Sequence, residues 1–117
     1  MGAWWGVDLD GTLAEYGGWK GKDHIGRPLM PMVEKIKEWL VKEREVRIFT
    51  ARVSSTMHSL EEIQEETARI QDWLERECGL PRLKVTAEKD YMTIEIWDDR
   101  CVQVEFNTGK RKYEETK

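Results

Sequence analysis

Two pairs of acidic residues stand directly after apolar runs in this 117-residue chain. Asp8 and Asp10 follow one run, and Asp98 and Asp99 follow another. Carboxylates crowded together repel one another, and Mg²⁺, a hard cation that prefers oxygen ligands, relieves that repulsion. A metal held in this way commonly binds phosphate oxygens, and an aspartate can act as a covalent nucleophile toward phosphorus. The acids therefore predict a Mg²⁺ site that handles a phosphoryl group.

The elements that must bring these acids together follow from the spacing of the apolar residues. Five short apolar runs predict strands, at 4–8, 45–50, 83–86, 93–97 and 101–106, the last as a half-buried edge. The 3.6-residue period predicts one helix from Pro31 to about Arg44. A second helix begins at the capping box Ser59–Glu62 and runs to Cys78, before Gly79.

This order of strands and helices predicts an α/β fold, a three-layer Rossmann-like sandwich with a mainly parallel sheet. Ligands in such sheets collect beyond the carboxyl ends of the strands. We therefore expect Asp8–Asp10, Thr50 and Asp98–Asp99 to meet in one place. We also expect one domain over 1–108 and a polar C-terminal tail over 109–117.

Composition narrows the classes of function. The chain is 39% hydrophobic and 36% charged, and its net charge is −4. No apolar run approaches the roughly 20 residues of a membrane helix, and no secretion signal opens the chain, so we expect neither membrane insertion nor secretion. Two unpatterned cysteines favour a reducing cytoplasm. A pI near 5.3 lacks the basic character that binding to a nucleic-acid duplex requires.

Four segments, in this order, resemble the motifs of the haloacid dehalogenase (HAD) superfamily of Mg²⁺-dependent phosphatases and phosphotransferases. They are Asp8-Leu9-Asp10-Gly11-Thr12-Leu13, Val46-Arg47-Ile48-Phe49-Thr50, Lys89 and Trp97-Asp98-Asp99-Arg100. The resemblance covers residues 8–105. It implies a phosphomonoester hydrolase without a cap domain, because no gap between motifs is long enough to hold one.

The resemblance also implies a role for each matching residue. Asp8 becomes the nucleophile that forms an aspartyl-phosphate, and Asp10 first donates a proton and then accepts one from water. Thr50 and Lys89 bind phosphoryl oxygens. The implied Mg²⁺ ligands are Asp8, the backbone carbonyl of Asp10, Asp98 and, beside or behind it, Asp99. The further residues expected at the substrate are Gly11, Thr12, Ala51 and Arg52, although Arg52 is equally well read as an exposed loop cation.

Lys89 departs from the expected spacing. It lies nine positions before Asp98, whereas parallel neighbours normally need a crossover of about a dozen residues. Either the 83–86 run is not a full parallel strand, or the crossover helix is missing, and Lys84 is the alternative phosphate-binding lysine. Without a cap, the site is open to bulky substrates, closed by the Glu15–Pro31 loop, or covered by a partner subunit in an oligomer.

A weaker similarity concerns the substrate. The Thr50–Arg52 segment, the helix containing 69–73 and the Trp97–Arg100 segment look similar to the phosphatase domain of phage-type polynucleotide kinase-phosphatases. This similarity implies a nucleotide or a 3′-phosphorylated nucleic-acid end as the substrate, alongside phosphorylated small molecules in general. Tyr16 and Trp19 either stack on a base or pack their own loop.

A regulatory domain is the alternative function. Receiver domains also gather acids, a hydroxyl residue and a lysine around Mg²⁺, so a catalytically silent Mg²⁺-binding or phosphoacceptor domain is the second hypothesis. The order of the motifs favours the phosphatase, because a receiver carries its phosphoacceptor alone on a later strand. In this chain the Asp8-to-Thr12 motif comes first and the adjacent acids come last.

Overall fold

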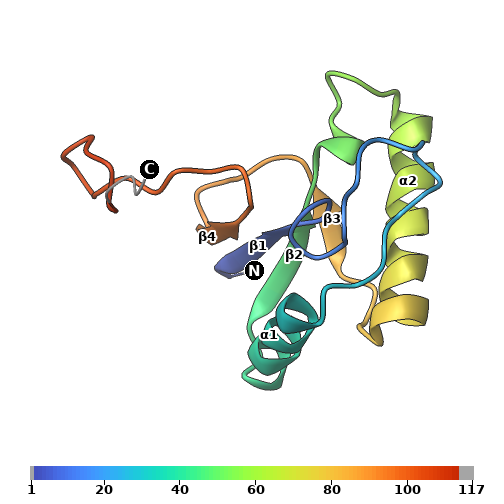
Figure 1. Cartoon of the computed structure of the whole chain (residues 1–117), viewed down its shortest axis with the longest axis horizontal. Coiled ribbons are helices and arrows are strands. Elements are labelled where there is room, and N and C mark those ends of the chain that lie inside the picture. Colours follow the sequence, from blue (N-terminus) through green and yellow to red (C-terminus); the bar gives the residue numbers. More distant parts are fainter. Residues whose placement is uncertain (1, 114–117) are drawn as a thin grey trace.

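The structure is a computed structural model and describes residues 2–113. Its four strands form one parallel sheet in the order β3-β2-β1-β4 (Figure 1). The strands are β1 (Trp4–Asp8), β2 (Glu45–Phe49), β3 (Lys84–Thr86) and β4 (Thr93–Trp97). The predicted α/β fold with a parallel sheet is confirmed. Because β1 is an interior strand, its carboxyl end has a neighbouring strand on each side.

The helices begin and end close to the predicted residues. Helix α1 (Met30–Val41) has Pro31 in its first turn, where a missing N–H costs no hydrogen bond. The predicted capping box of Ser59 and Glu62 is present at the start of α2 (Leu60–Trp73). A π-helical turn, η2 (Leu74–Cys78), continues it to Gly79, which is left-handed at φ 66°. In residues 2–113 no helix has the length and apolar composition that crossing a membrane requires.

One face of the sheet carries the hydrophobic core. Val7 and Ile48 are adjacent in the sheet register and fully buried. They belong to one cluster with residues of both helices, including Ile36 of α1 and Ile70 of α2. Both helices therefore pack on the same face, and residues 2–113 form two layers. The third layer of the predicted sandwich is not confirmed.

The other face of the sheet is crossed by the link between β3 and β4. Trp4 Nε1 donates a hydrogen bond to Asp90 at 2.9 Å, and Arg47 of β2 lies 3.7 Å from the same carboxylate. The Trp4 amide donates to the carbonyl of Met92 at 3.0 Å. The six-residue link contains no helix. The spacing of Lys89 left two possibilities, that the 83–86 run is not a full parallel strand or that the crossover helix is missing. The structure has the second, because β3 is a parallel strand and no helix connects it to β4.

The predicted strand over 101–106 is wrong. Its alternating residues Val102, Val104 and Phe106 are all exposed, Phe106 to 89%. The only pairing in this segment, within the described residues, is a bridge from Val104 to Arg111. The segment extends away from the sheet on the side opposite α2 (Figure 1). Of the predicted tail, residues 109–113 thus include the second arm of this small hairpin, and residues 114–117 lie outside the described residues.

Candidate functional site

A cavity of about 1000 Å³ lies at the carboxyl ends of the strands. Asp8 ends β1, Thr50 follows β2 and Asp98 follows β4, and all three line this cavity. The parallel sheet brings them together because its strands end at one edge. Four other predicted residues also line the cavity: Asp10, Ala51, Arg52 and Asp99.

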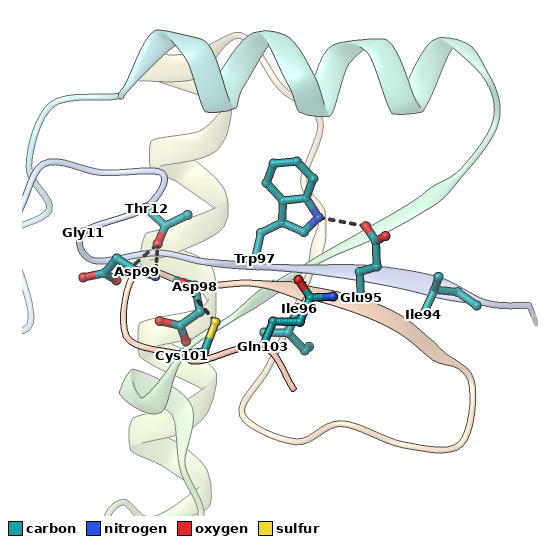
Figure 2. A pocket seen from close by; sticks show the side chains of 10 residues that line it. All are labelled: Gly11, Thr12, Ile94, Glu95, Ile96, Trp97, Asp98, Asp99, Cys101 and Gln103. Carbon is teal, nitrogen blue, oxygen red and sulfur yellow. Dashed lines mark hydrogen bonds between the residues drawn. The ribbon is translucent and has the colours of Figure 1, made fainter. Parts of the chain in front are cut away.

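Three carboxylates form a compact cluster in this cavity. Single oxygen atoms of Asp8, Asp98 and Asp99 lie within 4.8 Å of one another. The Thr12 hydroxyl lies 3.1 Å from Asp8 Oδ2 and 3.2 Å from Asp99 Oδ1, and it accepts the Asp99 amide hydrogen at 3.1 Å. Figure 2 shows Thr12 beside Asp99, with Asp98 next along the turn. Burial and the charge of Asp98, together with Asp99, raise the pKa of Asp8 to about 7.

The donor set fits a hard divalent cation. All three groups offer oxygen, and their negative charges repel one another unless a cation or protons neutralise them. Among the described residues the carboxylate of Asp10 does not join this cluster. It contacts the guanidinium of Arg52 instead, with its two oxygens 2.8 and 2.9 Å from Nε and Nη2.

Gly11 and Thr12 line an adjoining hollow of about 720 Å³, which runs along β4 (Figure 2). This hollow shares Asp98 and Asp99 with the main cavity. The Thr12 hydroxyl is engaged with the carboxylate cluster. The Thr12 side chain thus contacts two of the predicted metal ligands, Asp8 and Asp99.

Thr50 has a local structural role as well as a place in the cavity. Its hydroxyl oxygen accepts the backbone N–H of Arg52 at 3.1 Å and caps the short 3₁₀ helix η1 (Ala51–Val53). The Thr50 amide donates to the carbonyl of Thr86 at 2.8 Å. These bonds leave the hydroxyl hydrogen of Thr50 available for an oxygen in the cavity.

The two candidate lysines are not brought to the cavity. Lys89 lines a different hollow, and Lys84 lies on β3, 3.9 Å from the carboxylate of Glu45. The cations other than Arg52 that line the cavity are Lys22 and Arg100. The sequence analysis predicts a site role for neither residue. Arg100 directly follows the Asp98–Asp99 pair, which was the available signal, whereas nothing in the local pattern indicates Lys22.

The loop between β1 and α1 forms a wall of the cavity. Its Tyr16 and Trp19, 49% and 59% exposed, line the cavity together with Asp8. The loop is tied to α2, because Trp73 Nε1 donates to the carbonyl of Gly26 at 3.2 Å. At the base of the loop, the Glu15 amide donates to the carbonyl of Arg27 at 2.9 Å.

A scan of protein-family models and searches of curated proteins and of solved structures found no match to this chain. The function of this protein is therefore inferred from the geometry and chemistry of the site.

Proposed function

We propose that this protein is a Mg²⁺-dependent phosphomonoester hydrolase that acts through an aspartyl-phosphate on Asp8. One observation carries the proposal: Asp8 shares a cavity with Thr50 and lies in one carboxylate cluster with Asp98 and Asp99. This arrangement combines a nucleophile, a cluster suited to a cation and a hydroxyl donor in one open site. When bound, Mg²⁺ supplies positive charge that offsets the charge of the phosphate oxygens.

In the proposed reaction, a carboxylate oxygen of Asp8 attacks phosphorus, and the bond from phosphorus to the ester oxygen breaks. Asp10 gives its proton to the departing oxygen. Asp10 then accepts a proton from water as that water attacks phosphorus, which releases inorganic phosphate and restores Asp8. The Thr50 hydroxyl donates to a phosphoryl oxygen during both steps. The open cavity places few steric limits on the ester group.

We further propose that the substrate carries a planar group, as a nucleotide or a 3′-phosphorylated nucleic-acid end does. Tyr16 and Trp19 support this proposal because both line the cavity and both are partly exposed. Aromatic side chains stack on bases without strong sequence preference. A comparison of nucleoside monophosphates, 3′-phosphorylated oligonucleotides and sugar phosphates tests it. Equal kcat/KM across all three classes would contradict a stacking contribution.

Hydrolysis of 4-nitrophenyl phosphate tests the activity itself. We expect turnover with Mg²⁺, loss of turnover with EDTA, and loss in Asp8→Asn. The exposed loop residue Asp23 offers a matched control, and Asp23→Asn should retain activity. A protein that binds Mg²⁺ and hydrolyses none of these esters would instead support the regulatory-domain hypothesis.

A further inference from the structure

Every donor of the Arg52 guanidinium is engaged. Nε and Nη2 donate to the two oxygens of Asp10, at 2.8 and 2.9 Å. Nη1 donates to Glu66 at 2.9 Å and to the carbonyl of Lys22 at 3.0 Å. Nη2 also donates to the carbonyl of His24 at 2.8 Å. A guanidinium has five N–H donors, so none is left for a substrate phosphate unless one of these bonds breaks.

Glu66 is the buried end of this set of contacts. Its side chain is 3% exposed and accepts from Arg52 and from Arg69. Removing a carboxylate from water to this extent costs folding free energy unless charged partners form hydrogen bonds with it. Glu66 lies within α2, so this contact connects Arg52 to that helix. Burial alone would lower the pKa of Arg52, but hydrogen bonds to Asp10 and Glu66 raise it above its usual value.

We propose that Arg52 and Glu66 are positioning residues that orient the carboxyl group of Asp10 for proton transfer, an inference that rests on the proposed function. The two parallel contacts from Arg52 fix the plane of that carboxyl group. Each Asp10 oxygen keeps a further acceptor position, and Asp10 lines the cavity. Arg52 is itself fixed by Glu66, by two loop carbonyls and by the ring of Trp19, whose centroid lies 4.9 Å from the guanidinium carbon.

This role predicts a dependence on the leaving group. In the first step the proton on Asp10 moves to the ester oxygen, which takes the electron pair of the breaking bond to phosphorus. A poor leaving group such as phenol needs that proton, whereas 2,4-dinitrophenol leaves readily without it. Loss of orientation at Asp10 therefore slows the hydrolysis of phenyl phosphate more than that of 2,4-dinitrophenyl phosphate.

The experiment measures kcat/KM for both esters, because this quantity reports the step in which the leaving group departs. Arg52→Lys keeps the charge and loses the paired contact, and Glu66→Gln keeps the shape and loses the charge behind Arg52. We expect kcat/KM for phenyl phosphate to fall by about 10–100-fold in Arg52→Lys, and by less in Glu66→Gln, as part of the full general-acid effect. For 2,4-dinitrophenyl phosphate both variants should stay within about threefold of the wild type, since little acid assistance is needed.

Arg82→Lys is the matched control. Arg82 also contacts two carboxylates, those of Asp72 and Glu75, at the protein surface. The Arg82→Lys variant should leave kcat/KM for both esters unchanged. A purely structural role for Arg52 and Glu66 would reduce both rates equally, or neither, and would overturn the inference. Glu66→Gln provides the test if Arg52→Lys does not fold. A wild-type protein that hydrolyses neither ester would contradict the proposed function itself, which separates the two failures.

Discussion

A side chain at position 11 would occupy the space that the carboxylate of Asp99 fills. A Cβ built on Gly11 would lie 2.8 Å from Asp99 Oδ2, and Gly11 has a φ of +95°. A non-glycine residue would therefore meet both a strained backbone and a displaced carboxylate. The turn after β1 needs glycine so that it can approach the acidic turn after β4.

Gly11→Ala should consequently weaken Mg²⁺ binding. We expect about a tenfold loss of affinity, the usual scale for displacing a group that supports or orients metal ligands. Gly18→Ala is the matched control, because Gly18 has a similar φ of +108° but nothing within 4 Å of its Cβ position. Both variants should lose about 1–3 kcal/mol of unfolding free energy through backbone strain. Isothermal titration calorimetry with Mg²⁺ should show weaker binding in Gly11→Ala than in Gly18→Ala. Equal Mg²⁺ affinities in the two variants would show that Asp99 is not displaced.

Without a divalent cation, the protein should become less stable as the pH rises toward neutrality. The pKa of Asp8 is about 7 in the folded protein, against an ordinary value of 3.8. The folded state therefore holds its proton more tightly than the unfolded state, and the associated stability is lost between about pH 4 and pH 7. Thermal unfolding in EDTA should show this loss in the wild type and a smaller one in Asp8→Asn. Parallel pH profiles would contradict the raised pKa.

Mg²⁺ should reverse that loss, because a cation that binds only the folded protein stabilises it. Protons compete with the cation for the carboxylates, so the increase in melting temperature should be larger at pH 8 than at pH 5. The increase should be absent in Asp98→Asn. An equal Mg²⁺ effect in the wild type and in Asp98→Asn would exclude the carboxylate cluster as the binding site.

Substitution of single lysines should distinguish the candidates for the phosphate-binding cation. Lys22 lines the cavity, whereas Lys89 and Lys84 do not. We expect Lys22→Ala to lower kcat/KM for a phosphomonoester by about tenfold, the scale of one hydrogen bond to a charged group. Lys89→Ala and Lys84→Ala should each have a smaller effect. The reverse order would restore Lys89 to the role that its place in the sequence suggested.

Proton transfer by Asp10 has its own test. Asp10→Asn should slow the turnover of phenyl phosphate by about 10²–10⁴-fold, because an amide cannot donate or accept the proton. An amide has nearly the same size as the carboxylate, so the variant should still fold. Its melting temperature, compared with that of the wild type, checks this. Unchanged turnover would remove Asp10 from the mechanism.

The proximity of Asp8, Asp98 and Asp99 could be predicted because it follows from a general rule for parallel sheets. The turn after β1, the residue after β2 and the turn after β4 lie at one edge of any parallel sheet with these strands adjacent. The carboxylate cluster needed only that rule and the positions of Asp8 and Asp98. The adjoining contacts of Thr12 depend on how closely the two turns approach, which the spacing of residues does not determine.

The contacts of Arg52 could not be predicted in the same way, because they depend on tertiary packing. Glu66 comes 14 residues later in the chain, on another element. A sequence signal did exist: Glu66 lies between Ile63 and Ile70 at helical spacing, so a charge occupies the apolar stripe of α2. A charged residue in such a stripe indicates a buried partner. The guanidinium of Arg52 is that partner.

The error at 101–106 has a different cause. Alternation of Val102, Val104 and Phe106 is typical of a half-buried strand, but burial also needs a surface to cover the apolar side. The sheet ends at β4, and beyond that strand the chain extends away from the sheet (Figure 1). Periodicity alone cannot show whether a neighbouring strand is available.

The proposed mechanism transfers the phosphoryl group of the substrate to Asp8. The most direct measurement mixes the protein with Mg²⁺ and 4-nitrophenyl phosphate, quenches with acid, reduces with borohydride and identifies the modified peptide by mass spectrometry. Because borohydride converts an aspartyl-phosphate to homoserine, we expect homoserine at position 8 and at no other aspartate. Release of phosphate with Asp8 unmodified at every quench time, or modification at another aspartate, would contradict the account.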